Sequence, residues 1–331
     1  MVANHNLVRR SPARRVTARS GPQLQHVAQG VHLLQLGIVN VVFIADVRSG
    51  RWLLVDAGLV GTAHTIFRAA ETLFGQGARP DGILLTHGHF DHVGGLRELA
   101  ERWDAPVYAH RLEAPFLTGR SKYPPPDPTV GGGLMARSSP MFPRGPIDVS
   151  DRLILLDENG DGTGPVPNMP DWRWVHTPGH TPGHVSLFRE QDRTLVAGDA
   201  FVTTKQESAV AVFHQKLEIH GPPAYFTPDW GAAADSVRRL LALRPNAAAT
   251  GHGLPMRGPL MLRQLAGLAG HFEDMAVPRH GRYVGRPAAF DESGTIAVPE
   301  PVNDPVPKVL IAAGLAVAGL GLLLAAANRR H

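Results

Sequence analysis

Thr86-His87-Gly88-His89-Phe90-Asp91-His92 follows the apolar run Gly82-Ile83-Leu84-Leu85. Three imidazoles and a carboxylate are seldom crowded into so short a stretch by chance, and both groups suit zinc, iron or manganese. His87 and His89 are two positions apart, so an extended chain points them to the same side. A helix is predicted next, over 96–103. The stretch therefore predicts a loop at the end of a buried strand, with two ligands aimed at one metal and two at a neighbouring metal.

The composition allows one large domain or two modest ones, because the chain has 331 residues and 43% of them are hydrophobic. The net charge is +4, but residues 1–25 hold five arginines and no acidic residue, so the remainder carries +4 − 5 = −1. Residues 1–25 are predicted to be a basic disordered tail. A nearly neutral body gives no reason to expect specific nucleic-acid binding.

The chain contains no cysteine, which removes disulfides and thiolate chemistry. Any metal must then be held by nitrogen and oxygen atoms. The N-terminal segment has positive charge but no continuous apolar stretch before residue 31, so no secretory signal peptide is expected.

The C-terminal part predicts a membrane anchor. Residues 309–327 carry no charge and lie between Lys308 and Arg329-Arg330, a length at the threshold for a membrane-spanning helix. We expect this helix to anchor the protein with its enzyme domain in the cytoplasm, although the flanking charges favour a cytoplasmic C-terminal end. The alternative is a buried or interfacial helix of a cytoplasmic protein. The preceding range, 276–308, is rich in proline and is predicted to be a linker.

Strand and helix patterns alternate between the two ends, which indicates a layered α/β body. Apolar, β-branched runs predict strands over 30–36, 40–47, 52–56, 83–86, 172–176, 184–188, 194–197 and 247–250. Helices are predicted over 62–74, 96–103, 232–243 and 258–272. Residues 123–150 are crowded with proline and glycine and predict a long loop or lid beside the site.

Three further patches offer metal ligands at predicted strand ends. His180 lies in the turn His176-Thr177-Pro178-Gly179-His180-Thr181-Pro182-Gly183-His184, Asp199 ends an apolar strand, and His252 stands between two glycines. A single histidine in a turn is more often a surface residue than a ligand. The three patches taken together are informative, because a layered sheet can bring distant strand ends together.

The ordered set of these residues resembles the metallo-β-lactamase-fold hydrolase superfamily over about residues 27–265. The resemblance implies a four-layer αββα sandwich, here over 26–275, followed by the apolar C-terminal helix. It also implies two metal ions, most often zinc, with iron or manganese as alternatives. The implied ligands are His87, His89 and His180 for the first metal, Asp91, His92 and His252 for the second, and Asp199 as the bridge.

Other roles follow from the same resemblance. Asp56 matches a carboxylate that orients a ligand, and His184 matches a structural histidine outside the metal sphere. A water held between two metals becomes hydroxide near neutral pH and can attack a carbonyl or phosphoryl centre. Asp91 is the predicted catalytic residue, because it can bind its metal and orient this nucleophile.

The bridging aspartate and the absence of cysteine weaken a β-lactamase interpretation, and the second ligand set weakens a mononuclear persulfide dioxygenase. The chain is more similar to hydroxyacylglutathione hydrolases and N-acyl-homoserine lactonases, so we expect cleavage of a thioester, lactone or ester of a small molecule. The alternatives are a phosphodiesterase or nuclease of the same fold, or a noncatalytic membrane-tethered scaffold. Lys205, Tyr225 and Trp230 are candidates for the substrate pocket, or are ordinary loop and core residues. The sequence leaves the oligomeric state open.

Overall fold

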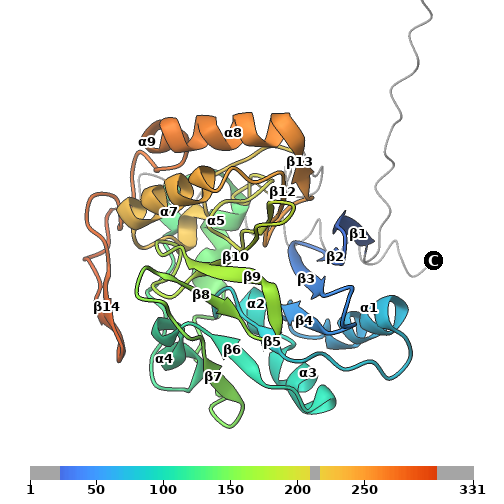
Figure 1. Ribbon diagram of the computed structural model, residues 1–331. Coiled ribbons are helices and arrows are strands. Elements are labelled where there is room, and N and C mark those ends of the chain that lie inside the picture. Colours follow the sequence, from blue (N-terminus) through green and yellow to red (C-terminus); the bar gives the residue numbers. More distant parts are fainter. Residues whose placement is uncertain (1–22, 209–216, 304–331) are drawn as a thin grey trace, which may run out of the picture.

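The computed structural model describes residues 23–208 and 217–303. Two β-sheets pack face to face, and helices cover the outer face of each (Figure 1). The sequence of layers is therefore helix, sheet, sheet, helix, which is the predicted α/β class.

The first sheet has seven strands in the order β1-β2-β3-β4-β5-β6-β7. Its members are β1 (Gln23–Ala28), β2 (Val31–Leu36), β3 (Val39–Ala45), β4 (Trp52–Val55), β5 (Ile83–Leu84), β6 (Val107–Ala109) and β7 (Leu153–Leu155). The strands β1 to β4 are antiparallel, and β4 to β7 are parallel. Parallel pairing carries the chain through a helix after each strand, so the carboxyl ends of β4 and β5 meet at one edge.

The second sheet has six strands in the order β13-β12-β11-β10-β9-β8. Its members are β8 (Thr163–Val166), β9 (Met169–His176), β10 (Val185–Arg189), β11 (Thr194–Val196), β12 (Ala247–Ala249) and β13 (Met256–Arg257). The β11–β12 pair is parallel and the other pairs are antiparallel. Both sheets are therefore mixed.

Three hydrophobic cores separate the four layers. One lies between the first sheet and the helices α1 (Ala63–Phe74) and α3 (Leu96–Trp103). The second fills the space between the sheets, and the third lies between the second sheet and the helices α7 (Trp230–Ala242) and α8 (Gly258–Gly270). Apolar burial on both faces explains why β3 is buried along almost its whole length.

Short helices occupy the connections. They are the α-helices α2 (Phe90–Val93), α4 (Ala114–Leu117), α5 (Leu134–Ser138) and α9 (Phe272–Met275), and the 3₁₀ helices η1 (Arg111–Glu113), η2 (Pro128–Val130), η3 (Ser139–Met141) and η4 (Ala224–Phe226). The predicted long loop over 123–150 thus contains α5 and two of the 3₁₀ helices.

A two-stranded hairpin, β14 (Ala289–Asp291) and β15 (Gly294–Ala297), lies at the side of the sandwich (Figure 1). It is fastened near α4, where the backbone N–H of Thr295 donates to Ser121 Oγ over 3.2 Å and Thr295 Oγ1 donates to the Lys122 carbonyl over 2.9 Å. The range 276–308, predicted as a linker, therefore contains paired strands.

The predicted membrane anchor requires a correction. Within residues 23–208 and 217–303, no helix combines the length and the apolar character that crossing a bilayer requires. The range 309–327, in which the spanning helix was expected, lies outside the described residues, as does the arginine-rich segment 1–22. The structure thus supports neither the anchor nor an apolar C-terminal helix as part of this fold.

Candidate metal centre

The seven predicted ligands come from strand ends at the same edge of the two sheets. His87 and His89 follow β5, and Asp91 and His92 lie on α2, which begins directly after His89. The turn between β9 and β10, the end of β11 and the end of β12 supply the other three, His180, Asp199 and His252. All seven side chains are buried.

One group of donors consists of His87, His89 and His180, whose ligand atoms all lie within 4.8 Å of one another. His89 Nδ1 is 2.9 Å from His180 Nε2. Three imidazoles at this spacing can converge on a single ion.

A second group consists of Asp91, His92 and His252, with the same mutual limit of 4.8 Å, and His252 Nε2 is 3.6 Å from Asp91 Oδ2. Asp199 lies between the groups. Its Oδ2 is 3.0 Å from His252 Nε2 and 3.4 Å from His180 Nε2. A carboxylate that touches one member of each group is placed to serve two ions.

Several buried polar atoms of this cluster have no hydrogen-bond partner: His87 Nε2, His92 Nε2 and Asp199 Oδ1. An unpaired buried polar atom costs roughly 1–3 kcal/mol, so three at one place call for an explanation. Cations bound among them would use these lone pairs, and nitrogen and carboxylate donors suit zinc, iron or manganese. The residues present therefore fit two divalent ions.

Burial keeps the first group of imidazoles neutral. It lowers the pKa of His89 to about 3 and holds the pKa of His87 and His180 well below the ordinary value. Neutral imidazole is the form that binds metal.

In the metal-free protein, the pKa values of the two histidines in the second group shift in the opposite direction. Burial lowers the pKa of His92 and His252, but the neighbouring carboxylates, Asp199 above all, outweigh it and raise both. Burial also raises the pKa of Asp199, yet the facing imidazoles of His252 and His92 bring it well below the usual range. Asp199 is therefore ionised, which is the form in which a carboxylate binds metal.

Asp56 orients His92, a member of the second group, by contacting the ring nitrogen that does not face the other donors. Its carboxylate accepts hydrogen bonds from the Thr86 backbone N–H at 2.8 Å and lies 2.9 Å from His92 Nδ1. A proton on Nδ1 leaves the lone pair of His92 Nε2 free for a metal. Asp56 has a φ of 63°, which places its carboxylate under the loop.

His184 positions Asp199 and takes no part in the metal groups. Its Nε2 accepts from the Asp199 backbone N–H at 2.9 Å, and its Nδ1 is 2.8 Å from Thr177 Oγ1. Burial lowers the pKa of His184 to about 3, so its Nε2 remains an acceptor.

Sequence reasoning missed Glu113, a fully buried carboxylate that joins two ligand loops. It accepts from the Gly88 N–H at 2.9 Å, between His87 and His89. It also accepts from the Gly183 N–H at 2.8 Å and Thr181 Oγ1 at 2.7 Å, next to His180, and from the Tyr123 hydroxyl. No motif surrounds Glu113, so only the fold reveals this role.

The three residues predicted to line a substrate pocket lie in different parts of the structure. Tyr225 lies in a buried aromatic cluster with Phe226, whose ring is 4.7 Å from that of His89. Trp230 belongs to the core beneath α7 and α8, and Lys205 is exposed. None of the three lines the small cavity that the described residues form beside His89.

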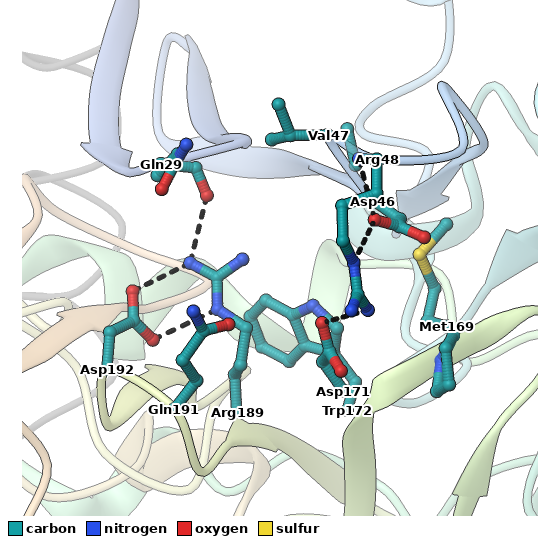
Figure 2. Close-up of a pocket in the computed structure, with 12 residues that line it drawn as sticks. Gln29, Asp46, Val47, Arg48, Met169, Asp171, Trp172, Arg189, Gln191 and Asp192 are labelled. Atoms are coloured by element: carbon teal, nitrogen blue, oxygen red, sulfur yellow. Dashed lines mark hydrogen bonds and ion pairs between the residues drawn. The ribbon is translucent and has the colours of Figure 1, made fainter.

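A separate cavity of about 240 Å³ lies at the other end of the sandwich, among the turns that follow β1, β3 and β10 and the start of β9 (Figure 2). Arg189 is nearly buried there, donates to both carboxylate oxygens of Asp192 and lies with its Cζ 4.9 Å from the Trp172 ring. Arg48 pairs with Asp171 at 2.9 Å. The lining holds no histidine and its charges are paired with each other, so the chemistry belongs to the opposite end.

Comparisons with known proteins agree with this geometry. The family model described as metallo-beta-lactamase superfamily matches residues 34–252. The probable metallo-hydrolase YflN of Bacillus subtilis is 47% identical over 254 residues, which are 76% of this chain and 94% of that protein. The probable metallo-hydrolase YybB of the same organism is 30% identical over 200 residues, 60% of this chain and 74% of that protein.

A solved structure shares the fold. The metallo-beta-lactamase of Erythrobacter litoralis, crystallised with beta mercaptoethanol in its active site, superposes with a TM-score of 0.50 at 16% identity, over 77% of this chain and 98% of that chain. At this identity the likeness concerns the fold alone.

Proposed function

Because the chain belongs to the metallo-β-lactamase superfamily and is a metallo-hydrolase of that fold, we propose that it hydrolyses a thioester, lactone or ester of a small molecule with two divalent ions, zinc first among them. One observation carries the proposal. The ionised Asp199 touches an imidazole of each donor group, and unpaired buried atoms surround it. Such an arrangement suits a pair of ions better than a single one.

The proposed roles follow the two donor groups. His87, His89 and His180 hold the first ion, Asp91, His92 and His252 hold the second, and Asp199 bridges. Two such ions lower the pKa of a water between them and stabilise negative charge that develops on a substrate oxygen. This supports hydrolysis without a nucleophilic side chain, in a chain that has no cysteine.

Asp91 is the proposed catalytic residue. The Asp91 residue is 8% exposed, so it lies at the margin of a cluster whose other members are more deeply buried. From there Asp91 Oδ2, which is 3.6 Å from His252 Nε2, can accept a hydrogen bond from the attacking water and hold its proton. Asp56 and His184 keep His92 and Asp199 in place while the proton moves.

The test is a hydrolysis panel with defined metal content. Purified protein loaded with zinc, manganese or iron is assayed against acyl thioesters, lactones, aryl esters and a phosphodiester. We expect turnover of at least one carboxylic ester or thioester, and a loss of about 10²–10⁴-fold in kcat for Asp91→Asn with its metal content measured in parallel. Turnover of the phosphodiester alone would replace the proposal, and inactivity on the whole panel with two ions bound would end it.

A further inference from the structure

A small cavity opens directly beside the first donor group. Its volume is about 10 Å³, room for about one water. It is lined by His89 and His180 and by six residues without formal charge, which are Tyr123, Pro124, Pro125, Phe226, Pro228 and Tyr283. A substrate atom that reaches the first metal must leave part of the molecule against these walls.

The polar atoms of the lining are already in use. The Tyr123 hydroxyl donates to Glu113 and accepts from the Gly88 N–H at 3.0 Å. The Tyr283 hydroxyl donates to the Pro125 carbonyl at 2.5 Å. Prolines have no N–H to offer. Apart from the two histidines, the lining side chains therefore offer no free hydrogen-bond donor.

The apolar surface continues outward from Phe226. The Phe226 ring is 6.2 Å from Phe90 and 6.2 Å from Phe142, and these two rings stack at 5.4 Å. Phe90 and Phe142 are partly exposed. An aromatic path thus leads from the surface to the edge of His89.

Two arginines contact lining residues without lining the cavity themselves. Arg144 donates from Nε and Nη2 to the Tyr123 carbonyl at 2.9 and 2.6 Å, and Arg282 has its Cζ 6.0 Å from the centre of the Tyr283 ring. A terminal carboxylate brought into the cavity would lose its water and meet no cationic side chain among the lining residues, and the ion proposed for His89 and His180 would be engaged by the acyl oxygen. Burying an ion without a partner costs far more than burying a methyl group.

We propose that this cavity is the acyl subsite, and that it selects uncharged, apolar acyl groups over acyl groups that end in a carboxylate. The inference rests on the proposed function for the meaning of "acyl" and names the substrate class of that same site. The proposal assigns recognition of the acyl group to Phe226 and its neighbours.

Among the lining side chains, Phe226 is the one that is free to move. The prolines are fixed to the backbone, and both tyrosine rings are tethered by their hydroxyls. Phe226 has no such tether, and its outer neighbour Phe142 is partly exposed. Because the cavity admits about one water, an acyl chain can enter only if the Phe226 ring moves.

Binding can be measured apart from hydrolysis. Hexanohydroxamic acid and the monohydroxamic acid of adipic acid have the same chain length, and both can bind zinc through the hydroxamate group. They differ only in the terminal carboxylate. Calorimetric titration of each into the zinc-loaded protein should give at least about tenfold tighter binding of hexanohydroxamic acid, since the terminal carboxylate must be desolvated. Equal or tighter binding of the adipic acid derivative overturns the proposal.

Turnover supplies the second readout. The ratio of kcat/KM for a hexanoyl thioester to that for the adipoyl thioester should be about 100 or more in the unmodified protein. Phe226→Lys places a cation at the wall and should reduce this ratio at least about tenfold, whereas Leu260→Lys adds the same charge on the exposed face of α8 and should not change it. An unchanged ratio in Phe226→Lys contradicts the assignment.

The outcomes separate the two proposals. If hexanohydroxamic acid binds selectively but no ester or thioester is hydrolysed, the proposed function fails and the subsite stands as a binding site. If hydrolysis occurs without discrimination, the subsite fails alone. Should Phe226→Lys not fold or not bind zinc, Phe226→Leu preserves an apolar wall and must retain the hexanoyl preference.

Discussion

Gly251 shows how tightly the metal centre is packed at the level of a single residue. A Cβ at this position would lie 2.0 Å from Asp199 Oδ1 and 2.8 Å from His92 Cε1. The sequence showed only that His252 stands beside glycines. The structure gives the reason, which is that the backbone of Gly251 fills the space against two donors from other segments.

Gly251→Ala should therefore displace Asp199 or His92. We expect a loss of about 1–3 kcal/mol in the free energy of unfolding and a lower zinc content, measured by urea denaturation and metal analysis. The control is Gly267→Ala on α8, where an added Cβ meets nothing within 4 Å and should stabilise the helix by about 0.5–1 kcal/mol. Gly251→Ala with two tightly bound ions would contradict this packing argument.

At the level of elements, the β2–β3 turn and the start of β3 secure a ligand that belongs to the other sheet. Asn40 Nδ2 donates to the carbonyls of Thr250 and Gly253 at 2.9 and 2.6 Å, on either side of His252. His252 Nδ1 lies 2.6 Å from the Ile38 carbonyl and is placed to donate to it. These contacts fix the orientation of the His252 ring, with Nε2 directed at Asp199.

Asn40→Ala should weaken the second ion more than the first, because His252 belongs only to the second donor group. Loss of a supporting contact of this kind typically lowers metal affinity about 10–100-fold. Zinc titration with a competing chelator should resolve one weakened and one retained site. Asn246→Ala, at an exposed asparagine, should leave both affinities unchanged. Equal weakening of both sites would show that the turn supports the fold rather than one ligand.

The success of sequence reasoning varied with the element. Strands predicted over 30–36, 40–47 and 52–56 match β2, β3 and β4, because their apolar side chains are buried in the sandwich. The edge strand β1 was missed, since its alternating glutamines and partly exposed side chains carry a weak apolar signal. The hairpin β14–β15 was missed because it is short and flanked by prolines, and its stability comes from pairing and contacts near α4.

The donor set could be expected from the sequence, and the surroundings could not. Histidine spacing and resemblance selected seven residues that the structure brings together. Tyr123 and Phe226 carry no comparable spacing signal, and they reach His89 through loops whose paths depend on tertiary packing. Lys205 and Trp230 were candidates only by nearness in sequence to Asp199, which did not predict nearness in space.

For the whole molecule, gathering so many histidines in the interior makes stability depend on pH when no metal is bound. Burial lowers the pKa of seven imidazoles below the ordinary value of 6.5. Four belong to the metal centre or touch it, His87, His89, His180 and His184, and the others are His32, His110 and His176. In the unfolded chain the same groups take up protons near pH 6.5. The unfolded state therefore binds more protons as the pH falls below that value, and the folded state is disfavoured.

Metal-free protein should lose stability as the pH falls from about 6.5 towards 5, by up to about 1.4 kcal/mol per pH unit for each of these groups. The raised pKa values of His92 and His252 do not oppose this trend, since both are protonated in either state below pH 6.5. Urea unfolding of chelator-treated protein at several pH values measures the slope, and His184→Gln should make it shallower. A flat profile between pH 5 and 6.5 would contradict the predicted burial.

Ribosomes synthesise the chain from its N-terminus. Ile38, whose carbonyl contacts His252 Nδ1, is therefore made long before His252. A nascent chain that stops before β12 contains His87 to His92, His180 and Asp199 but lacks His252. With the two ions proposed above, complete metal loading would therefore be a late step in the maturation of this protein. Truncated products of interrupted translation would be left with a partial donor set, and so would be recognisable by their failure to retain the second ion.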